Sequence, residues 1–274
     1  MSSPTPPSTL GKYQIIREIA RSNDIVYEAY DPQMDRRVAL KELNIPNGST
    51  PQQIKDRIDR FEREARAAGR LSHPNIMTVY DVDVENERHF MSMEFLDGHT
   101  LRNELDTNGA LGPERAIEVA KAILSGLQHA HDQGVIHRDI KPENIQILSN
   151  GQIKITDFGI ARLTFQPNIT MDGQVFGTPS YMSPEQVKGG DLDSRSDLFS
   201  VGVLLYEMIA GQKPFQGDSV ISITYAIMNA EPVQPSQCSF GLWQVIQKAL
   251  DKSPMLRFSS ASEMSKALDE AGIH

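Results

Sequence analysis

The stretch HRDIKPEN, residues 137–144, decides how the rest of the chain is interpreted. The triplet DFG, residues 157–159, begins thirteen residues after Asn144. Between them, IQIL and QIKI predict two short strands, because they flank the turn formers Ser149-Asn150-Gly151. The charged and amide side chains of both motifs are therefore expected on loops that border a small hairpin.

Outward from this stretch, the chain changes character near Leu96. Upstream, alternating or centrally apolar runs predict strands over 13–20, 24–31, 36–43, 76–82 and 88–96. One long helix is predicted over 51–71, where apolar residues recur every three or four positions. Downstream, the pattern predicts a helix over 114–134 and mostly helix over 194–271, with an apolar core helix at 196–211. The layout is a small sheet with one helix, followed by a larger helical part.

The composition is that of a globular protein. The 274 residues suit one large domain or two lobes around a shared cleft, and 39% of them are apolar, enough for a core. The net charge of −9 argues against a general nucleic-acid binder, which needs a basic surface. The one cysteine, Cys238, cannot form an internal disulfide or a cysteine-rich zinc site, so we expect a structural thiol in a reducing compartment.

No segment reaches the roughly 18 apolar residues of a membrane span. The nearest candidate, 199–211, is short and carries Glu207. Residues 1–10 have neither a basic start nor an apolar stretch, so a disordered tail is expected and a signal peptide is not. A membrane anchor beyond His274 stays open.

Two further motifs accompany these: VALK at 38–41 and SPE at 183–185. In this order and spacing, the four motifs resemble those of eukaryotic-type protein kinases, and specifically bacterial Ser/Thr kinases. The resemblance covers about residues 11–272. It implies an α+β, bilobal protein-kinase fold over residues 11–274. The small antiparallel-sheet N-lobe with one main helix would span about 11–96, and the larger helical C-lobe about 97–274.

The resemblance assigns catalytic roles to the loop. Asp139 would accept the proton of the substrate hydroxyl, and Lys141 would lie beside the transferring phosphate. Asn144 and Asp157 would offer oxygens to Mg²⁺, with Mn²⁺ as an alternative metal. Each residue alone is unremarkable, since a lone Asp is usually a surface or cap residue. The joint pattern decides the assignment.

The resemblance also implies an ATP site. Lys41 would hold the α- and β-phosphates and pair with a helix carboxylate. Glu64 is the expected partner, because Glu62 lies two residues away on another helix face; the alternative is a surface pair of Glu64 with Arg60. The remaining implied contacts are the gatekeeper Met93, the hinge Glu94, Phe95 and Leu96, and the apolar roof Ile19, Val26 and Ala39. Gln146 departs from the family, which usually has an apolar residue under adenine there.

Regulatory roles follow from the same resemblance. Arg138 would bind a phosphate group on the activation segment, 157–185. Thr170 is the expected phosphorylation site and Thr164 a weaker candidate. Asp172 would build in part of that charge. Thr178 would bridge the catalytic Asp and Lys. Two structural contacts are also implied: a buried Glu185–Arg257 salt bridge, and anchoring of the catalytic loop by Asp197.

One turn departs from the family. The family pattern is G-x-G-x-x-G-x-V, whereas this chain has Ala20-Arg21-Ser22-Asn23-Asp24, with no glycine and one residue deleted. Asn and Asp tolerate positive φ, so a tight hairpin turn is still expected. Asp24 adds a negative charge near a polyanion; either Arg21 offsets that charge or Asp24 faces solvent.

The sequence therefore favours an active, ATP- and Mg²⁺-dependent Ser/Thr protein kinase that phosphorylates protein substrates and its own activation segment. The first alternative is a pseudokinase scaffold, supported by the glycine-free turn. The second is a small-molecule kinase, which Thr178 and the SPE motif oppose. The expected location is the cytoplasm, as a free chain or as the cytoplasmic domain of a longer membrane protein. A homodimer through the N-lobe is a further expectation of the family.

Overall fold

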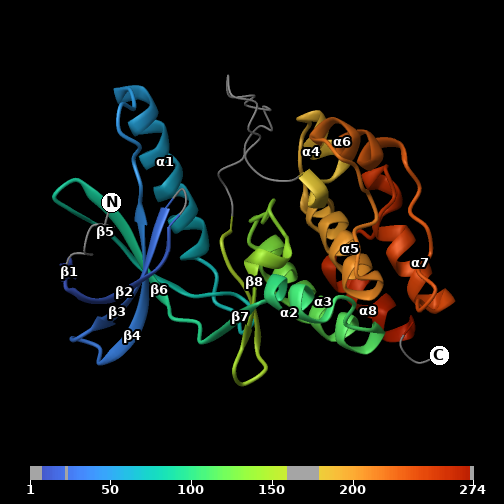
Figure 1. Cartoon of the computed structure of the whole chain (residues 1–274), viewed down its shortest axis with the longest axis horizontal. Coiled ribbons are helices and arrows are strands. Elements are labelled where there is room, and N and C mark those ends of the chain that lie inside the picture. Colours follow the sequence, from blue (N-terminus) through green and yellow to red (C-terminus); the bar gives the residue numbers. More distant parts are fainter. Residues whose placement is uncertain (1–7, 22–23, 159–178, 272–274) are drawn as a thin grey trace. The chain divides into compact units, whose positions relative to one another are not determined.

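The computed structural model describes residues 8–21, 24–158 and 179–271. The chain forms two compact units, of which the first ends at Asp97 and the second begins at Gly98 (Figure 1). The first unit is an antiparallel sheet with one long helix, and the second is mainly helical. The predicted α+β class is confirmed.

The sheet of the first unit has six strands, and every neighbouring pair is antiparallel. The spatial order is β1 (Thr9–Leu10), β2 (Tyr13–Arg21), β3 (Asp24–Asp31), β4 (Arg36–Leu43), β6 (Arg88–Glu94) and β5 (Val79–Glu85). Strands β3 and β4 match the predicted ranges at both ends.

Alternation along β3 and β4 separates the two faces of this sheet. Tyr27 lies opposite Leu40 and Ala29 opposite Val38, and all four belong to one buried apolar cluster with Phe90. Because side chains alternate, the other face carries the residues between them, Lys41 among them.

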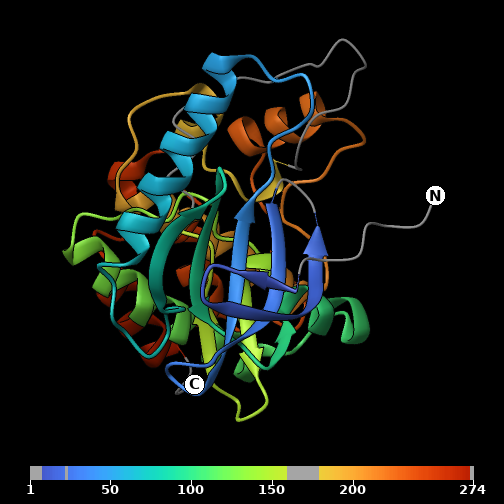
Figure 2. The ribbon, with the colours of Figure 1, turned by 90° about the vertical axis from the view of Figure 1, so that its left-hand side faces the viewer.

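Helix α1 (Pro51–Ala68) packs on the Lys41 face (Figure 2). Phe61 and Ala65 of the helix form a buried cluster with Met91, which pairs with Lys41 in the ladder. Thr50 caps the helix through a reciprocal pair of hydrogen bonds with Gln53. The sheet register thus places a helix against the strand that carries Lys41.

Three expected boundaries differ from the structure. Thr9 and Leu10, assigned above to a disordered tail, form β1, because Leu10 is fully buried in the cluster around Tyr13. Residues 1–7 of that tail lie outside the described part. The helix predicted to reach residue 71 ends at Ala68, and the strand predicted over 76–82 is β5, shifted toward its turn with β6.

The second unit begins with a small sheet. Its strands are β7 (Gly98–Thr100), β8 (Ile145–Leu148) and β9 (Ile153–Ile155), and β8 lies in the middle. Gly98 has a packing reason, since a Cβ there would lie 2.0 Å from the carbonyl oxygen of Ile147. The β8–β9 hairpin agrees with the predicted pair of short strands.

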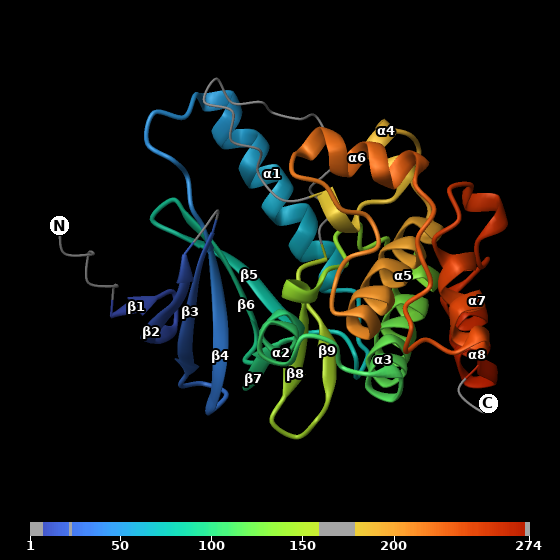
Figure 3. The same cartoon turned by 45° about the vertical axis from the view of Figure 1, so that its right-hand side comes forward.

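Helices make up the rest of the second unit, and Figure 3 shows α3, α5, α7 and α8 grouped together. Helix α5 is buried over nearly its whole length, as its apolar sequence predicts. Among the residues that the structure describes, no helix combines the length and apolar character that a bilayer crossing needs. The helices are α2 (Leu101–Asn108), α3 (Pro113–Asp132), α4 (Pro184–Lys188), α5 (Ser194–Ala210), α6 (Val220–Asn229), α7 (Phe240–Ala249) and α8 (Ala261–Ala271). Short 3-10 turns form η1 (Pro142–Asn144), η2 (Pro179–Tyr181) and η3 (Pro254–Leu256).

Candidate active site

The loop that carries Asp139 is fixed by Asp197 in the first turn of α5. The backbone N–H groups of His137 and Arg138 donate to the two carboxylate oxygens of Asp197, at 2.9 and 2.8 Å. His131 Nε2 lies 2.7 Å from the same carboxylate. Asp197 is almost completely buried. The predicted anchoring of the loop by Asp197 is confirmed, whereas no pattern in the sequence pointed to His131.

Backbone strain in this loop is held by a second set of contacts. Arg138 has φ +70°, a value that L residues rarely adopt. The buried ring of His137 accepts from the N–H of Asp139 at 3.2 Å and contacts the carbonyl of Thr156 at 2.8 Å. The ring also packs on Phe158, with 4.6 Å between centroids. His137 therefore ties the loop both to itself and to the segment that leads into Asp157.

Asp139, Lys141 and Asn144 form one hydrogen-bonded group. Lys141 Nζ lies 2.8 Å from Asp139 Oδ2. Asn144 Nδ2 donates to the carbonyl of Asp139 at 2.8 Å and to its Oδ2 at 3.2 Å. The Asp139 carboxylate is one third exposed, so it is reachable while its orientation is held from two sides.

The β8–β9 hairpin brings Asn144 and Asp157 together, although they are thirteen residues apart. Ile145 pairs with Ile155, and the N–H of Thr156 donates to the carbonyl of Asn144 at 2.9 Å. Because Asn144 Nδ2 is used toward Asp139, its Oδ1 is left as the acceptor end of the amide. Asp157 has φ +50°, a second constrained backbone at the site. One amide oxygen and one carboxylate therefore lie at the same end of the hairpin.

The guanidinium of Arg138 has a buried hydrogen-bond donor that no residue in the described part of the chain uses. Its Nε is buried and has no hydrogen-bond partner among the described residues. Its carbonyl accepts from Gln186 Nε2 at 2.8 Å, which connects the loop to α4. No pattern in the sequence pointed to Gln186, because the contact depends on where α4 packs.

In the first unit, Lys41 pairs with Glu64 and not with a neighbour of it. Lys41 Nζ lies 3.0 Å from Glu64 Oε1, and both side chains are about seven-eighths buried. Glu62 instead binds Arg66 at 2.9 Å on the exposed side of α1. The predicted choice between the two glutamates is therefore the one that the structure shows, and the pairing with Arg60 is not observed.

The sheet face around Lys41 is apolar toward the end of β6. Val26 pairs with Lys41, and Ala39 pairs with Met93, so these side chains share one face. Ile19 lies in a register shift of the β2–β3 pair and is 45% exposed, and its place in the roof stays a prediction.

The segment after β6 has one amide already in use. Glu94 donates its N–H to the carbonyl of Thr78 at 2.8 Å, and its carboxylate accepts from the N–H of Thr78. The guanidinium of Arg37 covers the ring of Phe95 at 4.0 Å. Of the expected hinge, Phe95 and Leu96 therefore keep backbone N–H groups that do not belong to the ladder.

Neither expectation about the negative charge of Asp24 in the glycine-free turn is met. Arg21 is engaged by Glu18 through two hydrogen bonds of 2.8 and 2.7 Å, so it does not offset Asp24. Asp24 does not face solvent either, since its Oδ2 lies 3.7 Å from Lys41 Nζ. Ala20 pairs with Val26 across the β2–β3 ladder. Ser22 and Asn23 lie outside the described residues.

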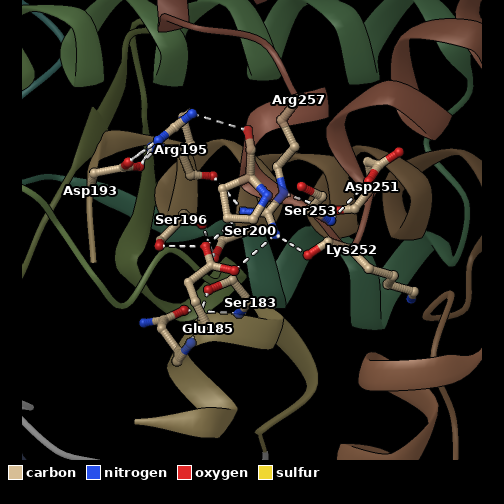
Figure 4. A network of polar contacts seen from close by, with 12 residues as sticks. Ser183, Glu185, Asp193, Arg195, Ser196, Ser200, Asp251, Lys252, Ser253 and Arg257 are labelled. Atoms are coloured by element: carbon tan, nitrogen blue, oxygen red, sulfur yellow. Dashed lines mark hydrogen bonds and ion pairs between the residues drawn. The ribbon is translucent and has the colours of Figure 1, made fainter. Parts of the chain in front are cut away.

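The predicted Glu185–Arg257 salt bridge is present and bidentate (Figure 4). The two nitrogen–oxygen distances are 2.7 and 2.9 Å, and the Arg257 side chain is fully buried. Burial alone would raise the pKa of Glu185, but hydrogen bonds from Arg257 and Ser196 hold it below its usual value. The pair joins α4 to Arg257, the residue after η3, and so fixes the base of the segment that follows residue 178.

Some residues that were expected at the site are not described by the structure. Thr164, Thr170, Asp172 and Thr178 lie outside the described residues. Gln146 is described: it lies on β8, half-buried, opposite Lys154 and Thr100.

An anchored loop that holds an Asp, a Lys and an Asn together is the arrangement that a phosphotransferase of the protein-kinase type requires. The family described as protein kinase domain matches residues 22–268, and the chain belongs to this family.

Curated relatives agree with this membership. Serine/threonine-protein kinase PrkC of Bacillus subtilis is 37% identical over 266 residues, which cover 95% of this chain and 40% of that protein. Serine/threonine-protein kinase PknB of Mycobacterium leprae is 38% identical over 271 residues, 95% of this chain and 43% of that protein. Serine/threonine-protein kinase PknL of Mycobacterium tuberculosis is 37% identical over 263 residues, 94% of this chain and 65% of that protein. The chain thus spans about two fifths of PrkC and PknB.

Proposed function

We propose that this chain transfers the γ-phosphate of ATP to Ser or Thr hydroxyls of proteins, its own activation segment among them. The observation that carries the proposal is the group of Asp139, Lys141 and Asn144, held on a loop that Asp197 anchors. The names of the relatives support Ser/Thr as the acceptor type. Lys141 supports it too, because its position two residues after the Asp resembles Ser/Thr kinases.

Asp139 would orient the acceptor hydroxyl and take its proton. The carboxylate is exposed enough to receive a side chain, and Asn144 and Lys141 fix its rotamer. Lys141 would turn from Asp139 toward the transferring phosphate, where its charge offsets the charge that develops. Asp139 and Asn144 are held in place before the substrate arrives, which lowers the barrier because only Lys141 has to reorient.

The chain offers a fitting site for Mg²⁺. The Oδ1 of Asn144 and the carboxylate of Asp157 are hard oxygen ligands, and the hairpin brings them to one place. Such an ion, when bound, neutralises phosphate charge. Mg²⁺ usually takes only one or two protein carboxylates and completes its shell with water and phosphate oxygens, so two protein ligands suffice. Mn²⁺ has the same ligand preference and is the alternative.

The first unit would hold the nucleotide. Lys41 would bind the α- and β-phosphates while Glu64 keeps its ammonium in position. Val26, Ala39 and Met93 provide an apolar face for adenine, and the backbone of 94–96 provides hydrogen bonds to it. The turn 20–24 would act as a shortened lid.

Arg138 supports regulation by a phosphate. A buried guanidinium nitrogen without a hydrogen-bond partner among the described residues suits an anion supplied by modification. Thr170 is the residue that we expect to carry it, and Thr178 would assist Asp139 and Lys141. Cytoplasmic placement, where ATP is present, and homodimer formation through the first unit remain predictions.

The decisive experiment compares the purified chain with Asp139→Asn after incubation with ATP and Mg²⁺. Phosphorylated peptides are mapped by mass spectrometry. We expect phosphate on the activation segment, Thr170 first, in the parent and none in the variant, because Asn cannot accept the proton. Phosphate in neither protein, together with no nucleotide binding at millimolar concentration, would overturn the proposal and favour the pseudokinase scaffold.

A further inference from the structure

The carboxylates of Glu64 and Asp24 both lie close to the ammonium group of Lys41. Glu64 Oε1 is 3.0 Å from its ammonium nitrogen and is hydrogen-bonded to it. Asp24 Oδ2 is 3.7 Å from the same nitrogen, beyond hydrogen-bond distance but within an ion pair. The three side chains are 12 to 20% exposed, so solvent screens them only in part.

The sheet register explains why Asp24 reaches Lys41. Val26 is directly opposite Lys41 on β4, so both side chains lie on the same face. Asp24 is two residues before Val26 on β3, so its side chain emerges on that face as well. Asp24 and Lys41 are therefore diagonal neighbours of the antiparallel pair. Because Asp24 itself pairs with Leu43, the ladder and not the turn holds it there.

The ion pair changes the charge of the phosphate-binding position. Asp24 adds a second carboxylate charge beside the ammonium of Lys41, and that charge repels an incoming polyanion. Of the two acids, Glu64 is the closer and hydrogen-bonded one, and Asp24 is the more distant and more exposed one. Asp24 is therefore the partner that an arriving phosphate would displace.

We propose that Asp24 is a built-in competitor for Lys41, which a nucleotide must displace before its phosphates pair with the lysine. Asp24 is thus a specificity-determining residue: it lowers affinity for nucleotides in general and favours those whose phosphates compete best for the ammonium. This inference rests on the proposed function, because it assumes that Lys41 receives nucleotide phosphate. A glycine at position 24 would have no side chain and could not compete for Lys41, so the replacement of glycine by Asp here affects nucleotide binding.

The test compares the parent with Asp24→Asn, which keeps the size and removes the charge. Glu18→Gln is the matched control, because it removes a charge from the same pair of strands, where Glu18 binds Arg21. Dissociation constants for ATP with Mg²⁺ are measured by calorimetry at one salt concentration. We expect Asp24→Asn to bind roughly three- to tenfold more tightly, the range for losing one partly screened ion-pair competitor, and Glu18→Gln to stay within about twofold.

A second readout needs no nucleotide. The acetylation rate of Lys41 by an N-hydroxysuccinimide ester is followed by mass spectrometry in the same three proteins. We expect a faster rate in Asp24→Asn, because Lys41 is released from one of its ion pairs, and no change in Glu18→Gln. An unchanged rate in Asp24→Asn overturns the inference.

The binding outcomes separate the inference from the proposed function. Equal or weaker ATP binding by Asp24→Asn, in a chain that does bind ATP, overturns the inference alone and indicates that Asp24 assists the nucleotide or its metal. No ATP binding in any of the three proteins overturns the proposed function, and the inference with it.

Discussion

At the scale of single residues, the Lys41–Glu64 pair makes a sharp prediction, because the helix offers a near neighbour as a control. Glu64→Gln should lower kcat/KM for phosphoryl transfer about ten- to a hundredfold, since a charge-assisted hydrogen bond of about 1.5–3 kcal/mol positions Lys41. Glu62→Gln should change kcat/KM by less than about twofold, because Glu62 binds Arg66 on the exposed side of α1. Equal losses in the two variants, measured with a peptide substrate, would argue against the assigned pair.

Of the two contacts that Lys41 makes with Glu64 and Asp24, only the first could be predicted from the sequence. Glu64 could be selected over Glu62 because helical periodicity fixes relative direction on one element. The Asp24–Lys41 contact could not be found this way, because it depends on the register between two strands. The charge at position 24 was visible in the sequence, but whether it faced Arg21, solvent or Lys41 was not.

Asp197 allows a second prediction at this scale. It accepts two backbone N–H groups through separate oxygens, and an Asn has only one acceptor oxygen. Asp197→Asn should therefore leave one buried N–H facing another donor and lower the free energy of unfolding by about 1–3 kcal/mol. Phosphorylation should fall as well, because the loop that carries Asp139 loses an anchor.

The matched control for Asp197→Asn lies at the start of the same helix. Asp193→Asn should preserve stability within about 0.5 kcal/mol, because Asn caps a helix as well as Asp does and the Asp193 side chain caps α5. Urea unfolding measures both variants. If Asp197→Asn unfolds like the parent, the anchoring contacts contribute little to stability.

At the scale of elements, long patterned segments were predictable, whereas short ones were predictable only where turn formers marked them, as in the β8–β9 hairpin. Strand β4 has a nearly continuous apolar centre, and both β3 and β4 have turn formers at their ends, so the pattern gave their boundaries. β1 and β7 have two or three residues and are strands only because a neighbouring strand pairs with them. α2, with eight residues, also escaped prediction, since its buried face holds only Leu101 and Leu105. Tertiary pairing, not local preference, decides such elements.

The salt bridge between Glu185 of α4 and Arg257 should make the free energy of unfolding depend on pH. Glu185→Gln leaves the buried charge of Arg257 without its anion and should lower the free energy of unfolding by about 3 kcal/mol at pH 7. The folded-state pKa of Glu185 is lowered, so its stabilisation is complete above its ordinary pKa of 4.5. It is lost as the pH falls further, through the folded value. The difference between parent and variant should therefore narrow below pH 4.5.

The control for this measurement is an exposed ion pair on α3. Glu118→Gln removes one ion-pair partner of Arg115, which also binds Glu104, and should cost less than about 1 kcal/mol at pH 7, so little stability can be lost toward acid. Urea unfolding at pH 7, 5.5 and 4 compares the three proteins. A gap between parent and Glu185→Gln that widens at pH 4 contradicts the assigned ionisation of Glu185.

At the scale of the whole molecule, two compact units make ligand-dependent stability informative, because each unit can have its own unfolding transition. A ligand stabilises only what it binds, by about 2.7 kcal/mol at a hundredfold excess over Kd. ATP with Mg²⁺ should raise the melting temperature of the parent by several degrees, and ATP with chelator should raise it less. Asp157 is the proposed metal ligand, so Asp157→Asn should abolish this difference, whereas Asp106→Asn, at an exposed residue of α2, should keep it. Equal shifts with and without Mg²⁺ in the parent would mean that Asn144 and Asp157 hold no ion, and an absent shift in both would return the chain to the scaffold alternative.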